Sequence, residues 1–256
     1  MPNSNLQAFN LTVSTLLKNP SHLLPNLTIS TFLDLPEQLG LHLTPTSTST
    51  PTSKATSESS SKEKVTIRAL VLDKDNTLCP PNTITFPPAY LHKLESLRTS
   101  PTSPFNQTTN PHGILIVSNT AGSRPESAAY ENEARRLEQE TLKHLKIPVF
   151  RVQPGKGRKP FCGPEVLAWF REKGVVDSAD QVAVVGDRLG TDVLMAAQMG
   201  AWSVWCKNGV THGVGKDAEK VNMDYRGFLA KVEIVMERYL RESRGLKPRV
   251  PRGWEA

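Results

Sequence analysis

The sequence has few of the features that mark secreted or membrane-spanning proteins. Its 256 residues contain three cysteines, and none is spaced from another like a metal-binding pair: Cys79, Cys162 and Cys206. An odd number of widely separated cysteines favours free thiols in a reducing compartment. No stretch approaches the roughly 18 apolar residues that span a bilayer, and no charged start precedes an apolar run of the secretory type. We therefore expect neither a disulfide framework nor a membrane-spanning helix.

Aromatic residues are absent from one long segment, and apolar residues are almost absent from it. Residues 44–64 read TPTSTSTPTSKATSESSSKEK. Such a segment cannot offset the entropy lost on ordering, so we expect a linker or a long surface loop there. Residues 99–112 (TSPTSPFNQTTNPH) form a second weak point, again rich in Pro, Ser and Asn.

Positive charge is in excess. The chain carries 31 Lys and Arg against 25 Asp and Glu, which gives a formal net charge of +6 and a pI near 9.3. A surplus of this sign favours an anionic partner, such as a phosphate ester, a nucleic acid or an acidic lipid surface. Basic proteins are common, however, so charge alone leaves the partner open.

Residues 1–43 form an apolar and nearly uncharged N-terminal segment. Apolar side chains recur on one face at helical spacing: Leu6, Phe9, Val13, Leu16 and Leu17. Pro20 should end this helix, and a second short helix, interrupted at Pro36, is predicted over 29–41. The apolar stripe can dock on the rest of the protein or lie in a membrane interface.

From residue 65 onward, strand and helix patterns alternate. Short runs rich in β-branched residues predict buried strands at 65–72, 113–117, 149–152, 181–185 and 201–205. Helical patterns lie between them at 90–97, 123–145, 164–173 and 191–199. This alternation is typical of a doubly wound α/β domain whose parallel sheet is covered on both faces. We assign the domain to 65–225 and expect its ligands beyond the carboxyl ends of the strands.

Residues 226–256 predict a basic helix followed by a tail. Between residues 226 and 252, eight Lys and Arg stand against three Glu. The helix also carries an apolar stripe: Phe228, Val232, Val235 and Tyr239. We expect that stripe to pack on the domain, which leaves the basic face free to contact anionic lipid at about 1 kcal/mol per basic residue.

Two carboxylates, Asp73 and Asp75, follow the first predicted strand of the domain in the run DKDNTL. A carboxylate can attack phosphorus and form an aspartyl-phosphate. A second carboxyl group can protonate the departing alkoxide and later deprotonate the attacking water. We therefore expect Asp73 to be a nucleophile and Asp75 a general acid and base. One Asp at a strand end is usually a turn residue or helix cap, but two are harder to explain in that way.

A second pair of carboxylates, Asp187 and Asp192, follows the fourth predicted strand in the run VVGDRLGTD. A carboxylate that attacks a phosphate dianion is repelled by it, so the reaction needs a cation, and Mg²⁺ prefers oxygen ligands. We expect Asp73, the backbone carbonyl of Asp75 and Asp187 to ligate Mg²⁺. Asp192 would orient a water or a lysine behind them, and capping of the next helix is an alternative role for it.

Hydroxyl and cationic groups lie between the two carboxylate pairs. Ser118, Asn119 and Thr120 follow the second strand of the domain and can donate hydrogen bonds to phosphoryl oxygens, although this run alone is only a turn signal. Lys159 stands in the basic run GKGRKP. Its ammonium group can neutralise charge on the nucleophile and on the transferring phosphoryl group.

Three further cations are candidates for binding the phosphate groups of a substrate: Lys156, Arg158 and Arg188. An arginine can contact a phosphate with two parallel hydrogen bonds. Each of the three can equally be a surface charge.

The motifs in this order resemble the haloacid dehalogenase (HAD) superfamily of aspartate-nucleophile phosphatases, over about residues 65–208. The resemblance implies a Rossmann-like fold, Asp73 as nucleophile, Asp75 as acid and base, and metal binding by the last Asp pair. The gaps between the motifs leave no room for a large cap domain. An open site of this kind suits a bulky substrate, such as a protein, a nucleic acid end or a lipid head group.

The forms LVLDKDNTL, SNT, GRKP and GDRLGTD are similar to those of the mitochondrial phosphatidylglycerophosphate phosphatases of fungi and plants. That similarity implies dephosphorylation of phosphatidylglycerophosphate in an anionic membrane surface, on the matrix side of the inner mitochondrial membrane, without a nucleic acid partner. An arginine-rich presequence is not visible, so the import route stays open, as does oligomerisation.

Two alternatives remain. One is a HAD phosphatase of a soluble phosphoprotein or nucleic acid end, and the other is a noncatalytic scaffold. The intact set of Asp73, Asp75, Lys159 and Asp187 counts against the scaffold.

Overall fold

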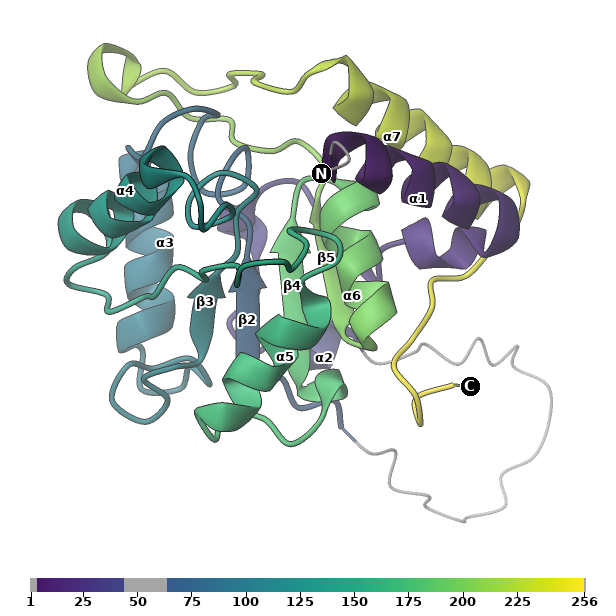
Figure 1. The fold of residues 1–256 in the computed structure, drawn as a ribbon, viewed down its shortest axis with the longest axis horizontal. Helices are drawn as coiled ribbons and strands as arrows, with labels where there is room; N and C mark the ends of the chain where they lie inside the picture. The colour runs from purple at the N-terminus through teal and green to yellow at the C-terminus, as the bar shows by residue number, and fades with distance from the viewer. Residues whose placement is uncertain (1–3, 44–63, 256) are drawn as a thin grey trace, which may run out of the picture.

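The computed structural model describes residues 4–43 and 64–255, which form an α/β protein built on one sheet (Figure 1). Within these residues, five parallel strands follow the order β1-β5-β4-β2-β3. The strands are β1 (Leu27–Ile29), β2 (Ala69–Leu72), β3 (Ile114–Ile116), β4 (Val182–Gly186) and β5 (Trp202–Cys206). The helices are α1 (Ser4–Lys18), α2 (Gly40–Leu43), α3 (Pro88–Thr99), α4 (Ala128–Arg136), α5 (Gly163–Glu172), α6 (Leu194–Met199) and α7 (Phe228–Arg238).

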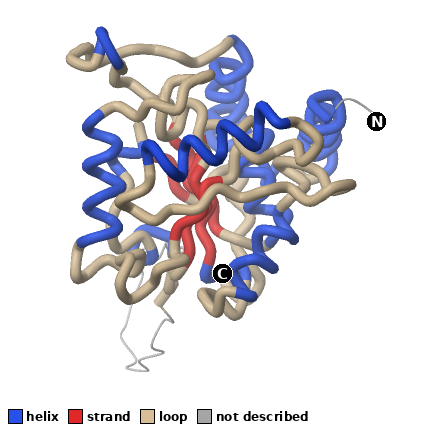
Figure 2. Tube along the Cα trace, turned by 60° about the vertical axis from the view of Figure 1, so that its left-hand side comes forward, coloured by secondary structure: helices blue, strands red, loops and turns tan. Residues whose placement is uncertain are grey.

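Helices cover both faces of this sheet, and successive strand residues enter two different hydrophobic clusters. Leu70 of β2 joins a cluster that includes Tyr90 of α3. The next residue, Val71, joins the cluster on the other face, which includes Phe170 of α5. Strands buried on both faces are expected to be apolar. Strands β2, β3 and β4 have no polar side chain, whereas β5 contains the buried Ser203 and the edge strand β1 contains the exposed Thr28. The predicted doubly wound parallel sheet is confirmed, and Figure 2 shows its strands enclosed by helices.

One predicted strand is wrong. Residues 149–152 form only an isolated bridge, between Ile116 and Val149. The fifth strand is β1, which pairs with β5 at the edge of the sheet, where Leu27 lies opposite Val204. Its last residue, Ile29, is the first residue of the helix predicted over 29–41 with an interruption at Pro36, and most of that stretch is not α-helical. That stretch contains a 3-10 turn over Phe32–Asp34 and the four-residue helix α2.

The N-terminal helix docks on the sheet domain, and it also leaves one face exposed. α1 ends at Lys18, before Pro20, as predicted. Its Leu11 and Leu16 pack against a buried cluster that includes Leu194 of α6, whereas its outer face is exposed. Apart from Lys64, the predicted linker 44–64 lies outside the described residues, and the division of the chain into four segments stays a prediction.

The apolar stripe of the C-terminal helix is exposed, so the prediction that it is core is wrong. Phe228, Val232, Val235 and Tyr239 are 44 to 79% exposed. The helix, which continues as a π-helical turn to Ser243, buries Ala230 and Glu233 instead. Its rotation is set by Glu233, which meets an arginine of the sheet domain. Among residues 4–43 and 64–255, none of the helices has both the length and the apolar composition needed to cross a bilayer.

The polar stretch 99–112 is fastened by a fully buried arginine. Arg98 donates hydrogen bonds to the carbonyls of Phe105, Asn110 and Pro111 at 2.9 to 3.1 Å, and to that of Leu145 at 3.0 Å. Buried donors need such partners, because an unsatisfied group costs free energy. The stretch therefore holds α3 to the start of β3.

Candidate active site

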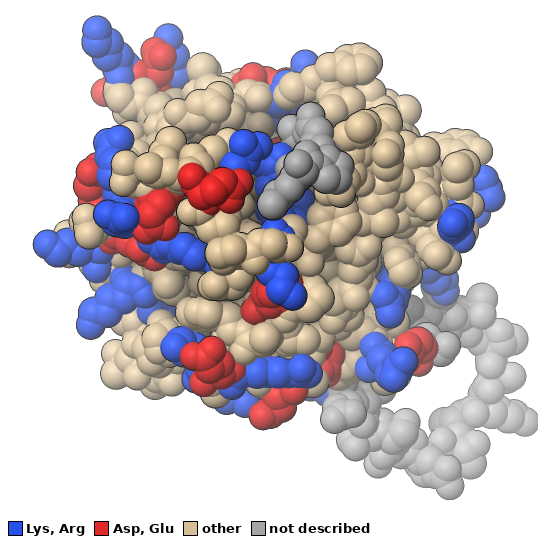
Figure 3. Space-filling view, in the orientation of Figure 1, with Lys and Arg blue, Asp and Glu red and all other residues tan. Residues whose placement is uncertain are grey.

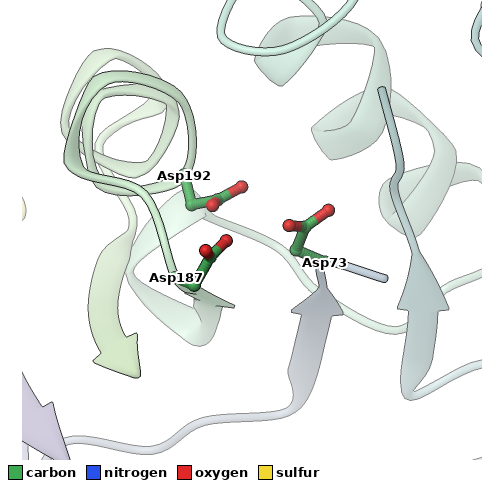
Figure 4. A group of neighbouring side chains, drawn as sticks. All are labelled: Asp73, Asp187 and Asp192. Carbon is green, nitrogen blue, oxygen red and sulfur yellow. The ribbon is translucent and has the colours of Figure 1, made fainter. Parts of the chain in front are cut away.

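Three carboxylates converge at the carboxyl end of the sheet (Figure 4). Asp73 follows β2, Asp187 follows β4, and Asp192 lies in the π-helical turn Leu189–Val193. Strands β2 and β4 are parallel neighbours, and the backbone N–H of Asp73 donates to Val185 at 2.9 Å. One oxygen from each carboxylate lies within 4.8 Å of the others. Figure 4 shows all three side chains turned toward a common space.

These carboxylates are buried, and one lysine neutralises part of their charge. Asp73, Asp187 and Asp192 are 8%, 5% and 1% exposed. Lys159 places its Nζ 2.5 Å from Asp73 Oδ1 and 2.6 Å from Asp192 Oδ1. This lysine precedes α5, and it is itself 3% exposed. This ammonium therefore pairs with two of the three acidic groups.

The protonation equilibria reflect this unbalanced charge. Burial raises the pKa of Asp73 to about 7, although the Lys159 ammonium lowers it. Burial also raises the pKa of Asp187 well above its usual range, and the neighbouring Asp73 and Asp192 carboxylates add to the effect. Burial lowers the pKa of Lys159, but Asp192 and Asp73 outweigh it and hold that pKa above the ordinary value. A divalent cation fits this set, because carboxylate oxygens are the ligands that Mg²⁺ prefers.

Gly186, the last residue of β4, makes room for one of these carboxylates. A Cβ atom at Gly186 would lie 2.2 Å from Cγ of Asp192. The side chain of Asp192 is held between Lys159 and the backbone N–H of Arg188, which donates to its Oδ2 at 3.2 Å. Any larger residue at position 186 must displace the Asp192 carboxylate from this position.

We expect Gly186→Ala to lower kcat by about a hundredfold, because a displacement of about 1 Å in a reacting site has an effect of that order. The measurement is steady-state hydrolysis of a soluble phosphomonoester. Gly227→Ala is the matched control, since a Cβ there meets nothing within 4 Å. Equal rates for the two variants would contradict the packing argument.

The side chain of Asp75 lies outside the three-carboxylate group, in a network of its own. It forms an ion pair of 2.8 Å with Lys74 and accepts a hydrogen bond of 2.9 Å from Thr120 Oγ1. Lys74 is fully buried and also pairs with Glu133 of α4 at 2.7 Å. Sequence reasoning missed Lys74 and Glu133. The position of a lysine between two acids was a signal for the first, whereas nothing in the sequence pointed to the second.

The predicted phosphate-binding residues lie at the end of β3, beside Asp75. Ser118 Oγ lies 2.9 Å from Thr120 Oγ1 and accepts a hydrogen bond of 3.0 Å from the Thr120 N–H. Asn119 Oδ1 is buried without a hydrogen-bond partner. This oxygen can accept a hydrogen bond from a hydroxyl of a bound group. A hydrogen bond to a phosphoryl oxygen would have to come from the amide nitrogen or the backbone N–H of Asn119.

The three additional cations have different surroundings. Arg158 is buried and donates to the carbonyl of Asn119 at 3.1 Å, next to the phosphate-binding residues. Lys156 forms an ion pair of 3.2 Å with Glu165 and is 57% exposed at its side chain. Arg188 forms an ion pair of 2.9 Å with Glu233 of α7. A role for any of them in binding phosphate stays a prediction.

The comparisons with known proteins agree with this geometry. The model of the mitochondrial PGP phosphatase family matches residues 6–211. The chain is 36% identical over 195 residues to the mitochondrial phosphatidylglycerophosphatase GEP4 of Saccharomyces cerevisiae, covering 76% of this chain and 83% of that protein. It is 30% identical over 226 residues to a probable mitochondrial phosphatidylglycerophosphatase of Schizosaccharomyces pombe, covering 88% and 90%. No solved structure gave a significant match.

The family model extends over α1 and the whole sheet, from β1 to β5. It therefore includes every carboxylate of the group around Asp73, together with Lys159 and the residues after β3. The chain belongs to the mitochondrial PGP phosphatase family, and it is a phosphatase.

Proposed function

We propose that this protein hydrolyses the terminal phosphomonoester of phosphatidylglycerophosphate to phosphatidylglycerol and inorganic phosphate, in mitochondria and at the matrix face of the inner membrane. The observation that carries the proposal is the buried group of Asp73, Asp187 and Asp192 around Lys159. It occurs in a chain that is similar to two proteins named as mitochondrial phosphatidylglycerophosphatases, one of them as probable.

In the first step, a carboxylate oxygen of Asp73 attacks phosphorus. The bond from phosphorus to the glycerol oxygen breaks, and the carboxyl group of Asp75 gives its proton to that oxygen. In the second step, the Asp75 carboxylate takes a proton from water, and this water attacks the phosphorus of the aspartyl-phosphate. The bond to Asp73 breaks, and phosphate leaves. The hydrogen bond from Thr120 to Asp75 supports this role, because it orients the acid.

The remaining site residues offset the negative charge of the phosphoryl group during its transfer. Lys159 stays protonated between Asp73 and Asp192 and offsets the negative charge of the transferring group. Asp73, the backbone carbonyl of Asp75 and Asp187 would hold Mg²⁺, and Asp192 would orient Lys159. When bound, the ion stabilises negative charge on the phosphoryl oxygens. Ser118 and Asn119 would donate hydrogen bonds to the same oxygens.

The lack of an inserted cap domain within residues 73–159 supports a lipid substrate. Between Asp73 and Ser118 the chain forms α3 and the loop fastened by Arg98, and between Ser118 and Lys159 it forms α4 and its π-helical turn. Both segments belong to the fold itself. A head group in a membrane surface can therefore approach the carboxyl end of the sheet.

Hydrolysis of phosphatidylglycerophosphate in vesicles, measured by phosphate release, tests the proposal. We expect its kcat/KM to exceed that of p-nitrophenyl phosphate and glycerol 3-phosphate by at least about a hundredfold, because contacts remote from the phosphate contribute to the transition state. Comparable efficiency on the soluble esters, on a phosphoserine peptide or on a nucleic acid 3′-phosphate would exclude the lipid assignment.

A further inference from the structure

Two helices far apart in the sequence expose large apolar side chains. The exposed apolar side chains recur at helical spacing along α1. They also recur at helical spacing along α7 and the π-helical turn that follows it. We refer to them together as the α1–α7 apolar surface, which consists of Leu6, Phe9, Val13, Leu17, Phe228, Leu229, Val232, Val235 and Tyr239. Their exposed fractions range from 40 to 79%. The α7 part lines an apolar groove of about 530 Å³.

The two helices lie side by side (Figure 1) and rest on the same elements. Thr12 of α1 donates to the carbonyl of Gly190 at 3.4 Å, and Glu233 of α7 accepts from the N–H of the same glycine at 3.2 Å. Leu16 and Met236 pack on one buried cluster. Figure 3 shows few charged side chains over these helices on the face in view. Single exposed apolar residues are ordinary, whereas a grouped set marks an interaction surface.

Basic residues accompany the apolar side chains. Helix α1 has no Asp or Glu, and the exposed cations on or beside the two helices are Lys18, Lys231, Arg238 and Arg244. Three of the four nearby acidic residues form ion pairs with Lys or Arg. The pairs are Glu233–Arg188, Glu237–Arg241, Asp224–Arg226 and Asp224–Lys231. The fourth acidic residue, Glu242, is exposed. Apolar helix faces flanked by Lys and Arg are typical of interfacial helices on anionic membranes. A second copy of the chain would instead oppose the same cations.

The loop after β4 and the bodies of the two helices separate this surface from the active site. The segment 187–192 carries Asp187 and Asp192 on the side of the catalytic carboxylates. On its other side, the backbone of Gly190 contacts both helices. A phospholipid keeps its acyl chains in the bilayer, so its phosphate reaches Asp73 only if the membrane-contacting surface lies close to the site. The α1–α7 apolar surface meets this condition.

We propose that the α1–α7 apolar surface docks on an anionic lipid bilayer and thereby brings the active site to its substrate, an inference that rests on the proposed lipid phosphatase function. Phe9, Phe228 and Tyr239 enter the boundary between head groups and acyl chains. The cations of both helices contact lipid phosphates. The loop 187–192 then lies one helix diameter, roughly 10 Å, from the head groups.

The test uses a variant with three substitutions, Leu17→Ser, Phe228→Ser and Val235→Ser, at the exposed positions. Co-sedimentation measures binding to vesicles of phosphatidylcholine and phosphatidylglycerol in equal parts. Burial of each such side chain contributes at least about tenfold to partitioning, so we expect the three substitutions together to weaken binding by about a thousandfold. Hydrolysis of p-nitrophenyl phosphate stays unchanged, which also shows that the variant is folded.

The matched control is Leu41→Ser with Val221→Ser, two exposed apolar residues outside the surface, and it binds vesicles like the unaltered protein. A second variant, Lys231→Glu with Arg238→Glu, keeps the apolar residues. We expect it to lose binding to the anionic vesicles as well. Pure phosphatidylcholine vesicles bind the unaltered protein at least about tenfold more weakly, because they carry no net charge.

Undiminished binding of either surface variant, or no binding by the unaltered protein, would overturn the proposal. So would an oligomer that the triple variant dissociates while vesicle binding persists, because the surface would then join copies of the chain. These vesicles contain no phosphatidylglycerophosphate, so the co-sedimentation assay measures membrane binding independently of the proposed enzymatic function. Binding without hydrolysis of phosphatidylglycerophosphate would refute that function alone. Hydrolysis in detergent micelles without vesicle binding would refute the docking alone.

Discussion

Asp73→Asn is expected to lower kcat by at least about a thousandfold and to abolish the aspartyl-phosphate, while the protein stays folded. The amide has nearly the shape of the carboxylate but cannot form an acyl phosphate by the same attack. It also removes one of three crowded acidic groups around Lys159, so the folded state loses repulsion together with one ion pair. Phosphate release and acid-stable labelling from a radiolabelled phosphoester measure the two effects.

The matched control for this variant is Asp177→Asn, at an aspartate whose side chain is 87% exposed. It should turn over substrate like the unaltered protein. Circular dichroism and thermal unfolding of the Asp73→Asn protein report whether the fold is retained. A folded Asp73→Asn protein with a near-normal rate would show that another group attacks phosphorus.

Removal of divalent metal ions by excess chelator is expected to reduce activity by about a thousandfold, the equivalent of roughly 4 kcal/mol of lost transition-state stabilisation. Without a cation, burial and the mutual repulsion of the carboxylates raise the pKa values of Asp73 and Asp187. Addition of Mg²⁺ should restore the rate. It should also raise the temperature of unfolding, because an ion that binds only the folded state stabilises it.

Asp187→Asn separates a direct effect of the ion from a general effect of the chelator. This variant should require a much higher Mg²⁺ concentration for activity and show a smaller thermal shift at a given concentration. Asp177→Asn should behave like the unaltered protein in both measurements. Full activity in excess chelator would remove the metal from the mechanism, whatever the response of the variants.

The sequence was sufficient to place the carboxylates together, because the carboxyl ends of parallel strands lie at the same edge of a sheet. Asp73 and Asp187 each follow a buried strand. Once β2 and β4 are neighbours, these two side chains must meet, although 114 positions separate them along the chain. Local patterns were therefore sufficient for this part of the site. The edge strand β1 was missed because a three-residue strand carries no periodicity that distinguishes it from a turn.

Helix periodicity was misleading at the C-terminus. α7 has apolar residues on more than one face, so its spacing does not say which face is buried. The structure buries Glu233, because its carboxylate pairs with Arg188 and accepts from the N–H of Gly190. The rotation that satisfies this buried charge turns Phe228 and Val235 outward. A paired charge at a helix–loop contact thus decided which residues the protein presents to its surroundings.

By itself, the sequence determined the strand–helix alternation, the order of the motifs and the identity of the acidic groups, because each depends on residues close together in the chain. Only the tertiary structure decided how Lys74 joins Asp75 to Glu133, how Glu233 holds the loop after β4, and where β1 completes the sheet. These contacts join residues from separate elements. Their formation depends on the angles at which helices dock, and no local pattern of residues fixes those angles.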